Sequence, residues 1–225
     1  MTDCPTKGVF LTFEGGDGTG KSTQADLLAK RLASCGREVC RVHEPGGTAL
    51  GEKIRALLLS HEQDDMVSLA ELFLYEAARA QVMAQVIEPA YAQGKVIICD
   101  RFTDSTVAYQ GFGRELGAER VGRLNALATA DHRPDRTILL VLDEKQARSR
   151  VIARSADGRG DRMESAGAAF NARMLEGFDD IAAADPQRVR RVDASGSIED
   201  VYGRVVSQVV DLLPELNGVR SEGVL

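Results

Sequence analysis

The sequence predicts an α/β fold in which a parallel five-stranded sheet is flanked by helices on both faces. Short apolar segments typical of buried strands alternate along the chain with longer amphipathic segments typical of helices. Near the start, a glycine-rich turn joins the first strand-like segment to the first helix-like one, as in a βα unit. The strand-like segments are nearly continuous apolar runs, which favours a parallel sheet covered on both sides.

The first βα unit occupies residues 9–24, which have the sequence VFLTFEGGDGTGKSTQ. Residues 9–13 are an apolar run rich in strand-forming residues. Residues 15–22 match the pattern G-x-x-x-x-G-K-[ST] without a mismatch. From residue 22 onward, apolar residues recur on one helical face: Ala25, Leu28, Ala29 and Leu32.

The later elements continue the alternation. Further strands are predicted at 37–43, after the helix-ending Gly36, at 95–99 (KVIIC), at 137–142 and at 189–192, where apolar runs are short. Apolar residues at helical spacing predict helices at 49–59, 68–93, 104–110, 119–129, 145–154, 164–184 and 197–213. Pro89 should kink the longest of these helices or end its first part.

These elements predict one domain over residues 1–213, followed by a loose tail at 214–225. Residues 155–162 are the most polar irregular stretch, and we expect them to form a short lid. A length of 225 residues with 44% hydrophobic and 28% charged residues is ordinary for one globular domain.

The charge and the apolar runs limit the expected partners. A net charge of −6 argues against a broad nucleic-acid surface, so an anionic ligand must be held by local arginines and backbone N–H groups. No signal peptide is apparent, and no apolar run approaches the roughly 18 residues of a membrane span. The four cysteines form no C-x-x-C pair and are expected to be reduced. We therefore expect a cytoplasmic protein with neither a nucleic-acid nor a membrane partner.

The glycine-rich turn predicts a site for a nucleoside triphosphate with Mg²⁺. Glycines let the backbone curl so that its N–H groups face phosphate oxygens, and the following helix N-terminus adds positive charge. Lys21 is expected to reach the β- and γ-phosphates, and Ser22 to ligate Mg²⁺. The predicted phosphate-binding residues are Gly15, Gly16, Asp17, Gly18, Thr19, Gly20, Lys21 and Ser22.

Polar or glycine-rich residues also follow two other strands. Glu44-Pro45-Gly46-Gly47 comes after the second strand, and Asp100-Arg101 comes after KVIIC. Ligands of open α/β sheets bind at the carboxyl ends of the strands, so these segments are expected to meet at one site.

Arg55, Arg79 and Arg101 are candidates for holding a second phosphate. Tyr75 and Arg79 are four residues apart on one helix, so an aromatic ring and a guanidinium could face a nucleobase together.

From about residue 8 to about residue 210, the chain resembles the bacterial thymidylate kinases, a family of P-loop nucleoside monophosphate kinases. The carrying segments are FEGGDGTGKSTQ at 13–24, EPGGT at 44–48, GEKIRALLL at 51–59, YEAARAQ at 75–81, DRFTDSTVAYQG at 100–111 and RPDRTILLVLD at 133–143. EPGGT at 44–48 and the DRF-x-x-S-T-x-A-Y-Q pattern at 100–110 are far more specific for this family than a phosphate loop alone.

The resemblance implies Mg²⁺-dependent transfer of phosphate from ATP to dTMP in dTTP synthesis, by a homodimer that pairs through its long helices. It implies that Asp17 faces the dTMP sugar and phosphate, and that Arg55 and Arg101 grip that phosphate. It implies that Tyr75, where the family usually has Phe, stacks on thymine, and that Arg79 binds a thymine carbonyl. The implied pocket is completed by Glu44 of EPGGT and by Thr106, Tyr109 and Gln110.

Two positions depart from the family pattern. The phosphate loop lacks the arginine that one branch of the family carries there, so the catalytic cation is expected from the lid. Arg159 is the first candidate and Arg162 the second, with Arg154 just before the lid, and Lys21 and Arg101 should share the catalytic load. His43 stands where arginine is usual, and we expect a packing or phosphate-side role for it.

Two other functions stay open on the sequence alone. A deoxynucleoside kinase would need a carboxylate base for a hydroxyl acceptor, and Glu14 or Asp17 could serve. A GTP-dependent switch would be expected to carry an N-K-x-D motif, which is absent. A phosphate acceptor, with a second pKa of about 6, needs no general base.

Overall fold

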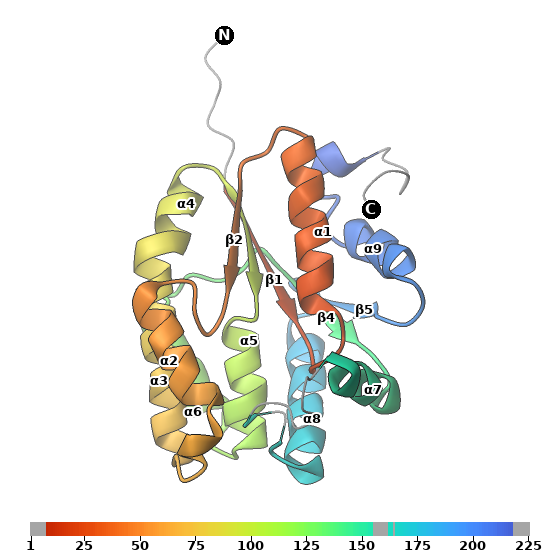
Figure 1. The fold of residues 1–225 in the computed structure, drawn as a ribbon. Helices are drawn as coiled ribbons and strands as arrows, with labels where there is room; N and C mark the ends of the chain where they lie inside the picture. Colours follow the sequence, from red (N-terminus) through yellow and green to blue (C-terminus); the bar gives the residue numbers. More distant parts are fainter. Residues whose placement is uncertain (1–7, 155–161, 164, 218–225) are drawn as a thin grey trace.

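The computed structural model describes residues 8–154, 162–163 and 165–217, and within them it confirms the predicted five-stranded parallel sheet. The strands are arranged in the order β2-β3-β1-β4-β5, and every pair is parallel (Figure 1). Their bounds are β1 (Val9–Glu14), β2 (Val39–His43), β3 (Val96–Asp100), β4 (Arg136–Val141) and β5 (Val189–Asp193).

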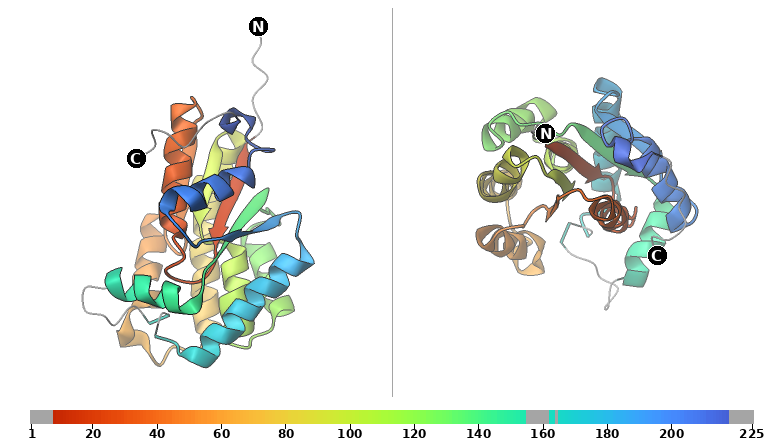
Figure 2. Two further views of the ribbon diagram at one scale, coloured as in Figure 1. Left: turned by 90° about the vertical axis from the view of Figure 1, so that its right-hand side faces the viewer. Right: turned by 90° about the horizontal axis from the view of Figure 1, so that it is seen from above.

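Helices cover both faces of this sheet (Figure 2). One face carries α1 (Lys21–Ser34) and α9 (Ile198–Ser207). The other carries α3 (Ser68–Val82), η2 (Met83–Ile87), α4 (Glu88–Ala92), η3 (Val107–Gly113) and α8 (Ala168–Ala184). The remaining helices are α2 (Ala49–Leu59), η1 (His61–Gln63), α5 (Thr103–Thr106), α6 (Ala118–Ala128), α7 (Glu144–Arg154) and η4 (Pro214–Leu216).

Alternation along each strand divides the core between the two faces. Leu11 and Phe13 of β1 pack with α1 and α9, whereas Phe10 packs with the α3–α4 layer. In β3, Ile98 belongs to the first group and Ile97 to the second. Successive side chains of a strand point to opposite faces of the sheet. Because helices cover both faces, apolar residues are needed at consecutive positions of each strand.

The register aligns the carboxyl ends of the three strands that the sequence singled out. Phe13 pairs with Asp100 across β1 and β3, and His43 pairs with Asp100 across β2 and β3. The glycine loop, Glu44 and Arg101 therefore begin side by side at one edge of the sheet, as predicted.

The observed helices differ from the predicted ones mainly where a π-helical turn interrupts the α-helix or where the helix ends earlier. The long helix at 68–93 includes a π-helical turn, η2, just before Pro89. Proline lacks an N–H for the regular helical bond, and the wider turn accommodates that loss. The helix expected at 104–110 is instead the short α5 followed by the π-helical η3, and α9 ends at Ser207 rather than at residue 213.

The start of the predicted loose tail is packed. Pro214–Leu216 form η4, Leu216 is buried in the α1–α9 core, and Glu215 pairs with Arg37 at 2.9 Å. Residues 218–225, and residues 155–161 of the lid predicted at 155–162, lie outside the described residues.

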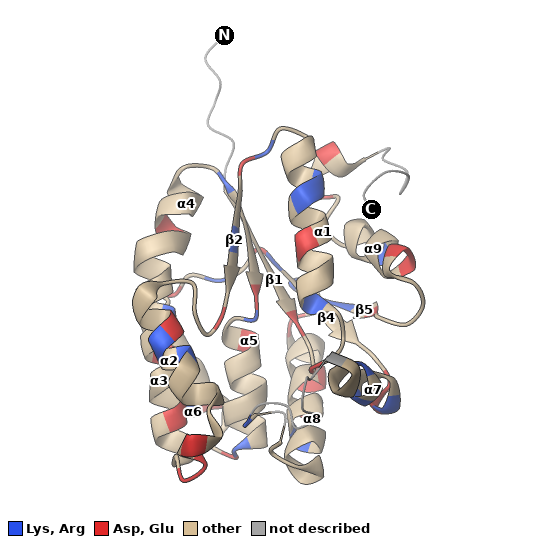
Figure 3. Cartoon of the chain, viewed as in Figure 1, with Lys and Arg blue, Asp and Glu red and all other residues tan. Residues whose placement is uncertain are grey.

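Acidic and basic residues are interspersed along the cartoon of Figure 3, with basic residues gathered on α7. Within the described part of the chain, no helix combines the length and apolarity needed to cross a membrane.

Candidate active site

The glycine loop between β1 and α1 adopts a conformation that requires glycine. Gly15 and Gly18 have φ angles of 127° and 77°, in the region that other residues rarely adopt. A Cβ atom on Gly15 would lie 2.3 Å from the Leu140 carbonyl oxygen, and one on Gly18 equally close to that of Ala147. The loop therefore packs directly on the end of β4 and on α7, and it opens at the N-terminus of α1, where an anion is favoured.

Lys21 lies in the centre of this loop. Its Nζ donates hydrogen bonds to the carbonyl oxygens of Gly15 at 3.1 Å and Gly16 at 2.8 Å. Burial, with the nearby positive charge of Arg101, lowers the pKa of Lys21 to about 8. A triphosphate would add negative charge here and favour the charged ammonium.

Ser22, the predicted Mg²⁺ ligand, contacts a residue that the sequence analysis did not assign to the metal. Its Oγ donates to Asp100 Oδ2 at 2.5 Å. Hydroxyl and carboxylate oxygens are ligands that Mg²⁺ accepts, usually with one or two protein groups and phosphates. No group of three or more His, Cys, Asp or Glu side chains suited to a metal occurs in the described ranges. The sequence signal for this role was the position of Asp100, a carboxylate at the end of the strand next to the glycine loop.

Arg101, Asp17 and Tyr109 converge on the other side of the loop. Arg101 Nη2 lies 2.5 Å from Asp17 Oδ1, and Nη1 donates to the Gly15 carbonyl at 3.1 Å. The guanidinium carbon lies 5.0 Å from the centre of the Tyr109 ring, and the Tyr109 hydroxyl donates to Asp17 at 3.4 Å. The structure thus joins three predicted substrate residues from separate segments.

Glu14 holds the turn that presents Arg101. Arg101 has a φ of 68°, in the left-handed region that is unfavourable for a side chain with Cβ. Glu14 accepts hydrogen bonds from the Phe102 N–H at 2.7 Å and from the N–H and hydroxyl of Ser105. Burial, and then the charge of Asp104, raises the pKa of Glu14 to about 8.

Arg79 is buried among acceptor side chains of four other residues. Glu44 accepts from Nε at 2.9 Å, and Arg79 Nη2 forms an ion pair with the same Glu44 oxygen at 2.7 Å. The other acceptors are Glu76 at 3.1 Å, Asn125 at 2.7 Å and Thr106 at 2.8 Å. Burial raises the pKa of Glu44 to about 7, although the charge of Arg79 opposes the shift. Glu76 and Asn125 are partners that the sequence analysis missed.

A cavity of about 410 Å³ brings most of the predicted substrate residues together. Arg55 is fixed at its wall, because its Nη1 donates to the Pro45 carbonyl at 2.9 Å. His43, also at the wall, lies 2.9 Å from Glu52 and is half exposed. The predicted residues that line the cavity are Asp17, Lys21, Ser22, Glu44, Arg55, Tyr75, Arg79, Arg101, Thr106, Tyr109 and Gln110.

Arg162 is not brought to the phosphate loop. It is buried, its Nη1 lies 2.7 Å from the Glu71 carboxylate, and its Nε donates to the Leu58 carbonyl at 2.8 Å. The other lid candidate, Arg159, lies outside the described residues.

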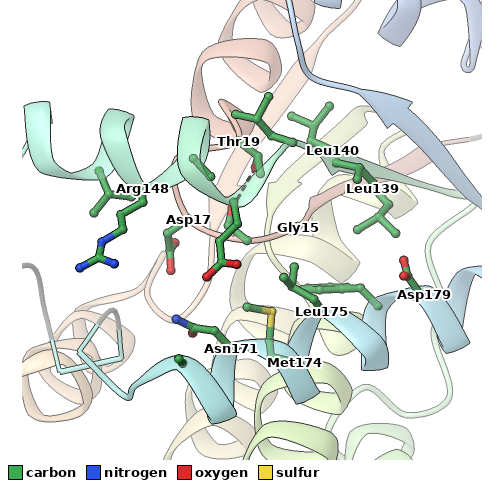
Figure 4. A pocket seen from close by; sticks show the side chains of 18 of the residues that line it. Gly15, Asp17, Thr19, Leu139, Leu140, Arg148, Asn171, Met174, Leu175 and Asp179 are labelled. Atoms are coloured by element: carbon green, nitrogen blue, oxygen red, sulfur yellow. Dashed lines mark hydrogen bonds between the residues drawn. The ribbon is translucent and has the colours of Figure 1, made fainter.

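A second cavity, of about 510 Å³, lies on the opposite side of the glycine loop, between α7 and α8. Figure 4 shows Asp17 beside it, with Arg148 on α7 and Asn171 on α8. Its floor is largely apolar and includes Leu139, Met174 and Leu175.

The two arrangements around the glycine loop define a class of protein. The loop, Lys21 and Ser22 have the arrangement expected of a triphosphate site, and the arginines around the neighbouring cavity are suited to a second phosphate. With the parallel sheet in the order found here, this is a P-loop nucleoside monophosphate kinase fold.

Comparison with known proteins identifies the family. A sequence model of the thymidylate kinase family matches residues 13–205. The thymidylate kinase of Synechococcus sp. (strain JA-3-3Ab) is 48% identical over 203 residues, which are 89% of this chain and 95% of that protein. The enzyme of Pseudomonas syringae pv. tomato is 46% identical over 209 residues, 93% and 96% of the two chains.

A solved structure agrees with these sequence matches. The crystal structure of thymidylate kinase from Ehrlichia chaffeensis superposes with a TM-score of 0.72 at 34% identity, over 89% of this chain and 97% of that one. The chain belongs to the thymidylate kinase family.

Proposed function

We propose that the site transfers the γ-phosphoryl group of Mg²⁺-bound ATP to the phosphate of dTMP, giving ADP and dTDP. Membership of the thymidylate kinase family gives the reaction, and the cavity beside the phosphate loop is the observation that supports the assignment of residues. ATP binds along the glycine loop, and dTMP occupies the cavity of about 410 Å³.

Catalysis on this proposal is alignment and charge neutralisation. Gly15, Gly16, Gly18, Thr19 and Gly20 hold the ATP phosphates with their backbone N–H groups, and Lys21 reaches the β- and γ-phosphates. Ser22 and Asp100, which are hydrogen-bonded to each other, would hold Mg²⁺ through their side-chain oxygens, and the ion would neutralise charge on the triphosphate.

The acceptor is positioned from three sides. Arg55 and Arg101 bind the dTMP phosphate, and Asp17 keeps Arg101 in place through the contact of 2.5 Å. Tyr75 stacks on thymine, and Tyr109 packs below the sugar. Arg79 binds a thymine carbonyl, and it also orients Glu44 and Thr106 around the base, because both accept its hydrogen bonds.

The cation that meets the transferred phosphoryl group comes from the lid, with Arg159 as the first candidate. Arg162 is the second, and in that role it would have to leave Glu71 and the Leu58 carbonyl. The loss of these contacts counts against Arg162 in this role.

The homodimer is proposed to form through α2, α3 and α6. Large apolar side chains are exposed on these neighbouring helices (Figure 1): Leu50, Leu57, Leu69, Phe73 and Leu127. A patch of this kind marks an association surface. Phe73→Asp should shift the sedimentation coefficient from that of a dimer to that of a monomer, and an unchanged coefficient would remove this face from consideration.

The activity is tested by coupled ADP release with dTMP, dUMP, thymidine, dCMP and dGMP as acceptors. The proposal expects dTMP to have the highest kcat/KM, and no turnover with thymidine. Preferential phosphorylation of thymidine would instead identify a nucleoside kinase.

A further inference from the structure

Glu71 is a buried carboxylate that the mechanism above does not use. It is on α3 with no exposed surface, and it is surrounded by three donor side chains from two other segments of the chain. Arg114 forms a two-pronged contact with it, at 3.1 Å and 2.9 Å, and Arg162 lies 2.7 Å away. Gln110 Nε2 donates to Glu71 Oε1 at 2.9 Å.

The charge state of Glu71 follows from these neighbours. Burial alone would raise its pKa, but the hydrogen bonds from Arg114 and Gln110, with the charge of Arg162, hold the pKa below its usual value. Glu71 is therefore ionised at neutral pH. An ionised carboxylate only accepts hydrogen bonds, so Gln110 has to direct its NH₂ group at Glu71.

This constraint decides what Gln110 presents to the substrate cavity, which it lines. The two ends of a carboxamide are opposite in polarity, so with Nε2 on Glu71 the carbonyl Oε1 is the end left for a ligand. Among the described residues, the side-chain hydrogen bond of Gln110 is the one that its Nε2 donates to Glu71, and none is found at its Oε1. The cavity therefore offers an acceptor at this point.

Thr106, four residues earlier on the same wall, has the complementary polarity. Its Oγ1 accepts from Arg79 Nη2 at 2.8 Å, which leaves the hydroxyl hydrogen free to be donated. One donor beside one acceptor matches the carbonyl and ring N–H of a pyrimidine imide. The cytosine edge has the opposite order, with an amino donor beside a ring acceptor.

We infer that Glu71 is a positioning residue for base selection, because it fixes the orientation of the Gln110 carboxamide so that only its carbonyl faces the base. The inference rests on the proposed placement of the dTMP base in this cavity. Glu71 touches no substrate itself and acts through Gln110.

Glu71→Gln provides a sharp test, because the replacement has nearly the same shape. Arg114 and Arg162 are donors only, so they will hold the new carbonyl oxygen and turn the new NH₂ group toward Gln110. Gln110 must then accept from residue 71 and present its own NH₂ group to the base. The kcat/KM ratio of dTMP to dCMP should fall about 10- to 100-fold, with a gain for dCMP as well as a loss for dTMP.

Arg114→Met is the matched control. It also disrupts the buried ion pair, but it leaves Glu71 as an acceptor for Gln110, so the dTMP-to-dCMP ratio should stay within about threefold of the wild-type value. If Glu71→Gln and Arg114→Met lower both substrates equally and leave the ratio unchanged, Glu71 is only structural and the inference is overturned.

Glu71→Gln leaves the guanidinium groups of Arg114 and Arg162 buried without a counter-charge. If this variant does not fold, the double variant Glu71→Gln/Arg114→Met removes one of these two charges. Arg162 still holds the carbonyl oxygen of the new residue 71, so the ratio should fall in this variant too, and an unchanged ratio again overturns the inference.

A measurement on the base itself separates failure of the inference from failure of the substrate placement. When [¹⁵N]dTMP binds the wild-type protein, its ring imino proton should become protected from solvent exchange, and Gln110→Met should remove that protection. An exposed imino proton in the wild-type complex would refute the placement of the base. Protection combined with an unchanged ratio in Glu71→Gln would refute the role of Glu71 alone.

Discussion

Replacing Arg79 by methionine should destabilise the protein strongly, because Arg79 neutralises two buried carboxylates. Arg79 is 1% exposed and contacts Glu44 at 2.7 Å and Glu76 at 3.1 Å. Methionine fills much of the volume but leaves both carboxylates without a counter-charge. Breaking a buried ion pair from one side costs about 3–5 kcal/mol, which for a chain of this size lowers Tm by about 10 °C.

The cost should depend on pH in a defined direction. The folded-state pKa of Glu44 is already raised from 4.5 to about 7, so its burial becomes unfavourable as pH rises through that window. Without Arg79, the pKa values of Glu44 and Glu76 rise further, and protonation at low pH relieves the repulsion. The free-energy difference between wild type and Arg79→Met should therefore be larger at pH 8 than at pH 5.5.

The assay is urea unfolding of both proteins at the two pH values. Arg123→Met is the control, since Arg123 pairs with Glu119 at 2.8 Å on the exposed surface of α6, where an ion pair contributes less than about 1 kcal/mol. A loss below about 1 kcal/mol for Arg79→Met, or a loss that does not change with pH, would refute this account of the Arg79 network.

Four further predictions concern the phosphate loop, the metal ligand and the two candidates for the catalytic cation. Lys21→Ala should abolish phosphoryl transfer from ATP to dTMP while Tm stays within a few degrees, and a near-normal kcat would refute the triphosphate assignment. Asp100→Asn should raise the Mg²⁺ concentration needed for half-maximal rate without changing the KM for dTMP, and an unchanged Mg²⁺ dependence would remove Asp100 from the metal site. Arg159→Ala should lower kcat about 10³-fold at saturating substrates. Arg162→Ala should mainly lower the free energy of unfolding, by about 3–5 kcal/mol through loss of its partner Glu71; a loss of kcat without a loss of stability would restore Arg162 as the catalytic cation.

The sheet and the meeting of its loops could be predicted because they follow from short-range patterns. Each buried strand is a continuous apolar run, and the glycine loop lies between a strand and a helix in the sequence itself. The rule that ligands bind at the carboxyl ends of parallel strands then joins Glu44 and Arg101 to the loop, and the register confirms it.

The buried ion pairs could not be predicted in the same way. Arg79 meets Glu44 and Asn125 across separations of 35 and 46 residues, and Glu71 meets Arg114 across 43. On a helix, a charged residue among apolar ones resembles an exposed side chain unless its partner is known. Only the packing of α3 against α6, with the hydrogen bonds of Glu71 to Gln110 and Arg114, shows that these charges are buried and neutralised from other segments.

The placement of the acidic residues also decides between a phosphate and a hydroxyl acceptor. A nucleoside kinase would need a carboxylate base, and Glu14 and Asp17 were the candidates from the sequence. Glu14 is fully buried and accepts hydrogen bonds from Phe102 and Ser105, while Asp17 is bound by Arg101 at 2.5 Å. Neither is free to take a proton from a substrate hydroxyl, whereas a phosphate acceptor is mostly ionised at neutral pH. The site therefore supplies positive charge and alignment, which are what transfer between two phosphates requires.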